Sequence, residues 1–104
     1  MIMRNKNTKQ LISAEESGAT FNTELFKDKM TRGGDASEFL CQFILSWRGY
    51  SASSLKVLKK FSLAGVGYKL DKTSRHQIYS MMQMDIHDPI FQELENVARE
   101  HLVV

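Results

Sequence analysis

The amino-acid sequence predicts an all-α fold, a compact bundle of four to five short helices. The chain of 104 residues has one proline and six glycines, whereas sandwiches and barrels need many turns, which are usually made with Gly, Pro, Asn and Asp. The glycines stand in a few places only and divide the chain into segments of helical length. No segment shows the sustained alternation of apolar and polar residues that is typical of a strand. Residues 35–48 are expected to form the central helix.

The chain is expected to form one domain. Hydrophobic residues make up 42% and charged residues 25% of the sequence, a balance that is typical of globular proteins and argues against wholesale disorder. Residues 1–10 contain few apolar groups, so we interpret them as a flexible N-terminal tail. Residues 11–104 would then form a single helical domain with a modest core.

Two short helices are predicted in the N-terminal part of this domain. The first falls within residues 11–20, around Leu11, Ile12 and Ala14. The second is expected to begin at Thr23 as its N-cap and to end at the Gly33-Gly34 pair. Its apolar face would contain Leu25, Phe26 and Met30.

The predicted helix over residues 35–48 has signals at both of its ends. Asp35 and Glu38 have the spacing of a capping box, in which two side chains satisfy free amide donors at a helix start. Gly49 is expected to end the helix in a left-handed conformation.

This helix is apolar over most of its surface. At 100° per residue it has one broad apolar arc, one narrow polar stripe, and a second apolar strip formed by Cys41 and Leu45. The arc contains Ala36, Phe39, Leu40, Phe43, Ile44 and Trp47, and the stripe contains Glu38, Gln42 and Ser46. A helix that contacts water along only one narrow stripe is usually covered by other segments on both sides of that stripe. Either the N-terminal helices cover Cys41 and Leu45, or these residues face another subunit or partner.

Two further helices are predicted between residues 51 and 86, separated by a loop. The first would begin at Ser51 or Ser53, and its inward face would contain Leu55, Val57, Leu58 and Phe61. In the loop, Gly65 and Gly67 would permit backbone angles that other residues avoid. The second helix is expected after residues 71–74, which offer several N-caps and in which Ser74 has capping-box spacing with Gln77. Its inward side chains would be Ile78, Tyr79, Met81, Met82 and Ile86, whereas Met84 points elsewhere and is a candidate for contact with a partner.

The last predicted helix follows Asp88, its N-cap, and Pro89, which stands at the first helical position, where a missing N–H has no consequence. Its apolar arc contains Ile90, Phe91, Leu94, Val97, Ala98, His101 and Leu102. Its polar face contains Gln92, Glu93, Glu95, Asn96, Arg99 and Glu100. We assign His101 a packing or capping role near the C-terminal end of the helix.

No residue pattern indicates catalysis, a metal or a cofactor. The segment GVGYKLDKT, residues 65–73, resembles a phosphate-binding loop only at its end, because Asp71 stands where that pattern requires glycine. His76, His87 and His101 lack the spacing that gathers ligands on one metal ion. We therefore expect no catalytic residue, metal site or cofactor, and a protein that is not an enzyme.

The charges are divided between two parts of the chain. Residues 51–75 contain six cations and one carboxylate, and residues 76–104 contain five carboxylates and one arginine. A basic helix, a glycine-containing turn and a second polar helix resemble a helix-turn-helix in outline, although the loop from Ser62 to Leu70 exceeds the usual three to four residues. The residues that would contact nucleic acid are Lys56, Lys59, Lys60, Lys69, Lys72, Thr73 and Arg75.

Two functions are compatible with this sequence. The leading hypothesis is a small non-enzymatic regulatory or adaptor protein that acts through protein contacts as a homodimer, with Cys41, Leu45 and Met84 at the interface. The alternative is a DNA-binding transcriptional regulator that uses the helix-turn-helix-like segment 51–80. The sequence contains neither a visible secretion signal nor an apolar run long enough to span a membrane, so we expect a cytoplasmic protein without membrane contact.

Overall fold

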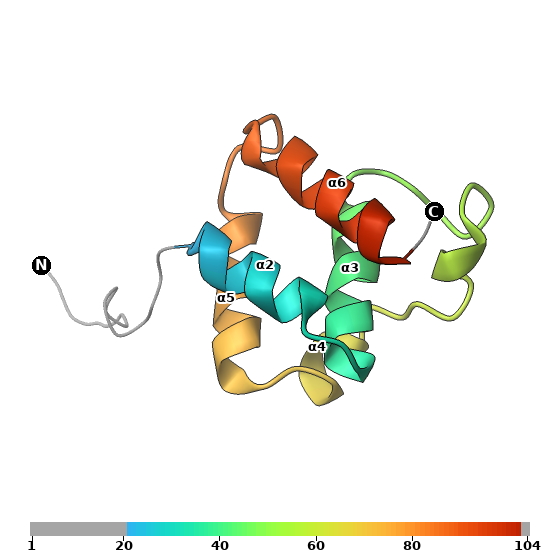
Figure 1. Cartoon of the computed structure of the whole chain (residues 1–104), viewed down its shortest axis with the longest axis horizontal. Helices are drawn as coiled ribbons and strands as arrows, with labels where there is room; N and C mark the ends of the chain where they lie inside the picture. The colour runs from blue at the N-terminus through green and yellow to red at the C-terminus, as the bar shows by residue number, and fades with distance from the viewer. Residues whose placement is uncertain (1–20, 103–104) are drawn as a thin grey trace, which may run out of the picture.

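The computed structural model describes residues 21–102, so the predicted tail over residues 1–10 and the predicted helix within residues 11–20 lie outside the described residues. The described chain is all-helical and contains no strand, which confirms the predicted fold class. Its elements are α2 (Thr23–Thr31), α3 (Asp35–Trp47), the 3-10 helix η1 (Lys56–Leu58), α4 (Gly65–Tyr68), α5 (Lys72–Met82) and α6 (Ile90–Leu102) (Figure 1).

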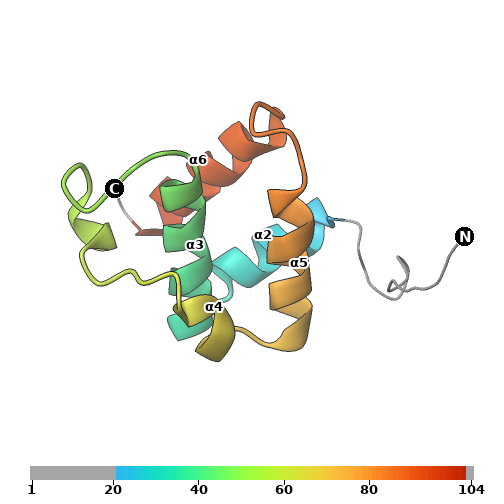
Figure 2. The ribbon, with the colours of Figure 1, turned by 180° about the vertical axis from the view of Figure 1, so that it is seen from behind.

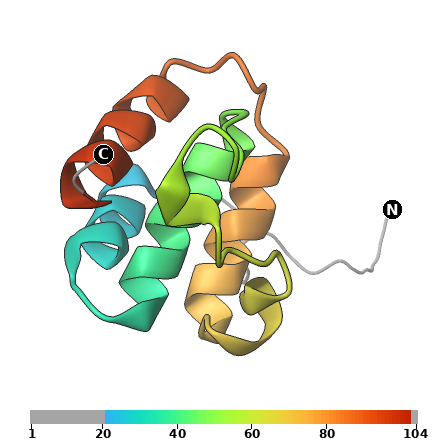
Figure 3. The ribbon, with the colours of Figure 1, turned by 90° about the vertical axis from the view of Figure 1, so that its right-hand side faces the viewer.

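The predicted central position of α3 is confirmed. Figure 3 shows α3 in the middle of the molecule, with α2 and α6 on one side and α5 on the other. Its buried side chains include Phe39, Leu40 and Ile44. The partners of these side chains in the single core are Phe26 and Met30 of α2, Ile78 and Met81 of α5, and Phe91, Leu94 and Ala98 of α6.

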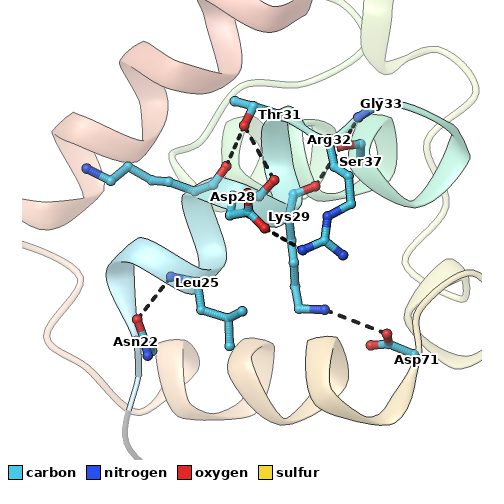
Figure 4. Close-up of polar contacts among 10 residues, drawn as sticks. Asn22, Leu25, Asp28, Lys29, Thr31, Arg32, Gly33, Ser37 and Asp71 are labelled. Carbon is cyan, nitrogen blue, oxygen red and sulfur yellow. Dashed lines mark hydrogen bonds and ion pairs between the residues drawn. The ribbon is translucent and has the colours of Figure 1, made fainter.

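The start of α3 differs from the sequence prediction. Gly34 occupies the N-cap position without a side-chain cap, so Asp35 and Glu38 form no capping box. Gly33 and Gly34 have φ angles of 96° and 94°, which residues with a Cβ rarely adopt, and they reverse the chain between α2 and α3. The Ser37 hydroxyl holds this turn, since its Oγ accepts from the Gly33 N–H at 2.9 Å and donates to the Lys29 carbonyl at 2.6 Å (Figure 4).

Two other helix ends can be compared with the capping residues predicted from the sequence. Gly49 ends α3 as predicted, with φ 101°; its N–H donates to the Ser46 carbonyl, and the Tyr50 N–H donates to the Leu45 carbonyl. The cap of α2 is Asn22 rather than Thr23, because the Asn22 Oδ1 accepts from the Leu25 N–H at 3.0 Å.

Residues 51–62 do not form the predicted amphipathic helix. Ser54 Oγ accepts from the Ser51 N–H at 2.9 Å and donates to the Ser51 carbonyl, and such local serine bonds compete with helical ones. Gln42, predicted on the wet stripe of α3, is buried, and its Nε2 donates to the Val57 carbonyl at 2.9 Å. This hydrogen bond ties the irregular segment to α3, and Leu58 is buried beneath the segment.

The predicted loop over residues 63–70 contains the short helix α4. Its glycines do not adopt the positive φ angles that were expected of them. Gly65 is instead required by close packing, since a Cβ at this position would lie 2.4 Å from Cε1 of the buried Phe39 ring.

The last two helices begin at aspartates. The Asp71 Oδ1 accepts from the Ser74 N–H at 2.8 Å and caps α5, so the predicted pairing of Ser74 with Gln77 is wrong. The Asp88 Oδ1 accepts from the Ile90 N–H at 2.9 Å at the start of α6, as expected of an N-cap. On α6 the predicted core residues Phe91, Leu94 and Ala98 are buried, whereas His101 is exposed and does not pack in the core.

Candidate functional site

The interface predicted for Cys41 and Leu45 is not on the surface of this fold. Both side chains have 0% exposure within the chain's own core, and the Cys41 thiol donates to the Met30 carbonyl of α2 at 3.4 Å. Of the two interpretations of this strip, burial by the chain itself is therefore correct. Burial also raises the pKa of the Cys41 thiol to about 12, so the thiol stays protonated at neutral pH. Met84, the third predicted interface residue, is half-buried against the core.

The predicted nucleic-acid residues lie in or close to three elements, η1, α4 and α5, that follow one another around α3 (Figure 2). The first helix of the expected helix-turn-helix is absent, because only the 3-10 turn η1 forms there, and that motif is therefore ruled out. Five of the basic side chains are exposed and have no ion-pair partner among the described residues: Lys56, Lys59, Lys60, Lys69 and Lys72. Thr73 is exposed at the start of α5, and Arg75 is half-buried with its Nη1 donating to the Leu70 carbonyl at 2.7 Å.

Exposed large hydrophobic side chains are concentrated in one part of the described chain. All of them fall between residues 63 and 86, and α2, α3 and α6 contribute none: they are Leu63, Tyr68, Tyr79, Met82 and Ile86. On α5, Tyr79 and Met82 are 51% and 46% exposed. They share one side of the helix with Lys72 and Arg75, because spacings of three, four and seven residues bring side chains to the same side. We call these four residues the outer face of α5.

Sequence reasoning assigned Tyr79, Met82 and Ile86 to the core, and the structure corrects this. Apolar residues adjoin one another in Ile78-Tyr79 and Met81-Met82, so the α5 sequence permits two different inward faces. A contact from the start of α2 selects the face that contains Gln77: the N–H of Asn22, the N-cap of α2, donates to the Gln77 Oε1 at 2.7 Å. Gln77 and Ser74 thus lie on the buried side with Ile78, and Tyr79 turns outward.

A pocket of about 190 Å³ lies beside the N-terminal end of α5, between the end of α2 and the start of α3. Its charged residues are Lys29, Arg32, Lys69 and Asp71, and the buried Leu40 forms part of its wall. Figure 4 shows Lys29 reaching from α2 toward Asp71 at the start of α5. Three cations therefore surround a pocket that contains one carboxylate.

That carboxylate is already engaged by the protein. The Lys29 Nζ lies 3.6 Å from the Asp71 Oδ2, and the Lys29 side chain is only 11% exposed. Hydrogen bonds from Ser74, and then the charge of Lys29, hold the pKa of Asp71 below its ordinary value. Arg32 pairs with Asp28 of its own helix, which leaves several guanidinium donors free of that contact. Lys29 and Arg32 were not predicted as site residues, because only the packing of α2 on α5 brings them to this position.

Comparisons of the chain with protein-family models, curated proteins and solved structures found no match. Within residues 21–102, no helix is long and apolar enough to cross a membrane. Among these described residues, no group of three or more His, Cys, Asp or Glu side chains lies close enough together to hold a metal ion. Inferences about function therefore depend on three features of the described residues: the outer face of α5, the pocket beside its N-terminal end, and the exposed lysines.

Proposed function

We propose that the protein is a small non-enzymatic regulatory or adaptor protein that binds another protein through the outer face of α5. The observation that carries this proposal is the concentration of exposed large hydrophobic side chains between residues 63 and 86. Exposed apolar side chains mark interaction sites where they lie together with a polar rim, and on the outer face of α5 Tyr79 and Met82 lie together beside Lys72 and Arg75. Tyrosine, methionine and arginine, which contribute three of the four residues of the outer face, are enriched at protein interfaces.

The composition of the outer face favours a selective and reversible contact. Tyr79 and Met82 supply apolar area, and methionine adapts its shape to different partners. Lys72 and Arg75 add positive charge, which speeds encounter with an acidic partner and disfavours a basic one. Cys41 and Leu45 do not support the expected homodimer interface, because both side chains are buried within the chain.

Position-specific photo-crosslinking tests this proposal. A photoreactive phenylalanine analogue at Tyr79 should give a discrete protein adduct in cells that make the protein. The same analogue at Asn96, an exposed residue of α6, should give none. Met82→Glu should remove the Tyr79 adduct without loss of helicity, because Met82 is exposed. Equal adducts from both positions, or none from Tyr79, would contradict the proposal, and an adduct of twice the chain's mass would identify the partner as a second copy.

A second candidate function is DNA binding, as expected of a transcriptional regulator. The observation that favours it is the set of five exposed lysines without ion-pair partners in the described chain. Phosphate contacts release counterions, so such binding should weaken steeply as salt increases. Lys59→Glu with Lys72→Glu should then abolish a mobility shift of duplex DNA while helicity is unchanged. This candidate is rejected if the wild type shifts no duplex even at low salt.

A further inference from the structure

We infer that the pocket beside α5 receives an acidic side chain of the partner, and that the partner presents an acidic amphipathic helix. This inference depends on the proposed function, since it names the partner's chemistry. Three properties of the pocket lead to it: its charge, its size and its place on α5.

The charge of the pocket favours a carboxylate. Lys29 and Arg32 from the end of α2 and Lys69 from the segment after α4 surround one cavity, whereas Asp71 is held by the Ser74 N–H and by Lys29, and Arg32 pairs with Asp28. Lys69 has no acidic partner among the described residues. The lining thus has more cations than carboxylates, and such an excess of positive charge attracts an anionic group. An incoming carboxylate would accept charge-assisted hydrogen bonds there.

The size of the pocket favours a side chain over a free ligand. Pockets for drug-sized ligands and cofactors occupy about 300–1,000 Å³, and this one occupies about 190 Å³. A glutamate or aspartate side chain fits such a volume, and its flexible stem lets the carboxylate reach a recess. A phosphate group within a duplex backbone would meet the exposed lysines outside the pocket more readily.

The place of the pocket connects it with the outer face of α5. Asp71 lines the pocket and directly precedes α5, and Met82 lies 11 residues further along the chain on the same side of the helix. At 1.5 Å per residue these positions are about 16 Å apart along the axis, which a partner helix spans with about 11 residues. A matching helix therefore has an acidic residue at one end and apolar residues about three turns away.

A second copy of this chain does not present that combination on any one of its described helices. The exposed carboxylates of α6 include Glu93 and Glu100, but α6 exposes no large hydrophobic side chain. The outer face of α5 exposes Tyr79 and Met82 together with cations rather than carboxylates. The acidic and apolar groups that the partner must combine are thus on different helices of this protein.

A synthetic peptide tests the inference. The probe is a fluorescein-labelled amphipathic helix of about 15 residues, with glutamates at one end and leucines at spacings of three and four residues, and its binding is measured by fluorescence anisotropy. Lys69→Glu should weaken binding about tenfold or more, because it replaces an attraction with a repulsion in a partly desolvated site. Lys56→Glu is the matched control, since Lys56 is exposed and unpaired on η1 and does not line the pocket. It makes the same change in net charge and should alter the affinity less than about threefold.

A charge exchange sharpens the test. A peptide in which lysines replace the glutamates should bind the wild type poorly and should regain affinity for Lys69→Glu. Equal weakening by Lys69→Glu and Lys56→Glu, or no wild-type binding of the acidic peptide, overturns the inference. A short DNA duplex that displaces the peptide from the wild type but not from Lys69→Glu also overturns it.

Met82→Ser separates this inference from the proposed function. Loss of peptide binding in Met82→Ser, combined with equal effects of the two lysine variants, would leave the protein-binding function in place and reject the role of the pocket. Unchanged peptide binding in Met82→Ser would contradict the proposed function itself, because the apolar part of the outer face would then contribute nothing.

Discussion

Replacing Glu95 with alanine should lower the free energy of unfolding by about 2–3 kcal/mol. Glu95 lies on α6 and is only 8% exposed. Its Oε1 accepts from the Arg48 Nε at 2.8 Å, and its Oε2 accepts from the Tyr50 hydroxyl at 2.8 Å. Without the carboxylate, the Arg48 Nε and the Tyr50 hydroxyl both lose this acceptor in a partly buried environment. The Arg48 side chain is 24% exposed and also donates to the Gln92 Oε1, so the loss should fall below the 3–5 kcal/mol typical of a fully buried pair.

Urea denaturation, followed by Trp47 fluorescence and far-ultraviolet circular dichroism, measures this loss. Trp47 lies close to α6, with its ring 6.4 Å from that of Phe91, so its emission should report the unfolding of the α3–α6 contact. Glu100→Ala is the matched control: Glu100 is exposed on the same helix, and such substitutions usually stay within about 0.5 kcal/mol. Equal effects of Glu95→Ala and Glu100→Ala would refute the reasoning.

The loss should also depend on pH. Burial alone would raise the pKa of Glu95, but hydrogen bonds from Arg48 and Tyr50 outweigh it and hold the pKa below its ordinary value. A depressed pKa in the folded state contributes stability that is present above the unfolded value of about 4.3 and is lost as the pH falls through the folded value. The difference between wild type and Glu95→Ala should therefore shrink as the pH is lowered from 7 to below about 4. A difference that is independent of pH would show that the ion pair does not provide it.

Three further predictions concern the core. Gly65→Ala should lower the free energy of unfolding by about 1–3 kcal/mol, because its Cβ would lie 2.4 Å from the Phe39 ring, whereas Gly67→Ala meets nothing within 4 Å and should not lower it; thermal denaturation that ranks the two variants equally would contradict this. Leu45→Glu should abolish cooperative unfolding at every protein concentration, because it buries an unpaired carboxylate; a folded variant in circular dichroism and sedimentation would show that this strip faces a partner. Cys41 should react with an aromatic disulfide reagent only after the chain opens, since its side chain is fully buried and burial also raises the pKa of its thiol to about 12; fast labelling of the native protein would disprove this.

The candidate site was only partly predictable from the sequence. The lysines of residues 51–75 were recognised as a basic group, and Lys69 and Lys72 remain part of the two surfaces beside α5. Lys29 and Arg32 were not, because each stands as an ordinary cation at the end of a short helix. Their contribution arises only when α2 packs across the start of α5, a contact between residues more than 40 positions apart.

By itself, the sequence determined the features that local physics controls. Helical periodicity and the scarcity of turn residues determined the fold class. The breadth of the apolar surface on α3 determined its central position, and Gly49 determined where α3 ends. These features depend on backbone angles and side-chain spacing within a few residues, so no distant contact is needed to predict them.

Only the tertiary structure decided which of several possible faces each helix buries. Cys41 and Leu45 could have faced a partner, Glu95 could have faced water, and Tyr79 could have been in the core. Burial on a helix with apolar residues on two sides depends on which neighbouring segment packs there, and a buried carboxylate is tolerated only where donors reach it. Arg48 and Tyr50 meet Glu95 across 45 or more residues of sequence, a distance at which periodicity carries no information.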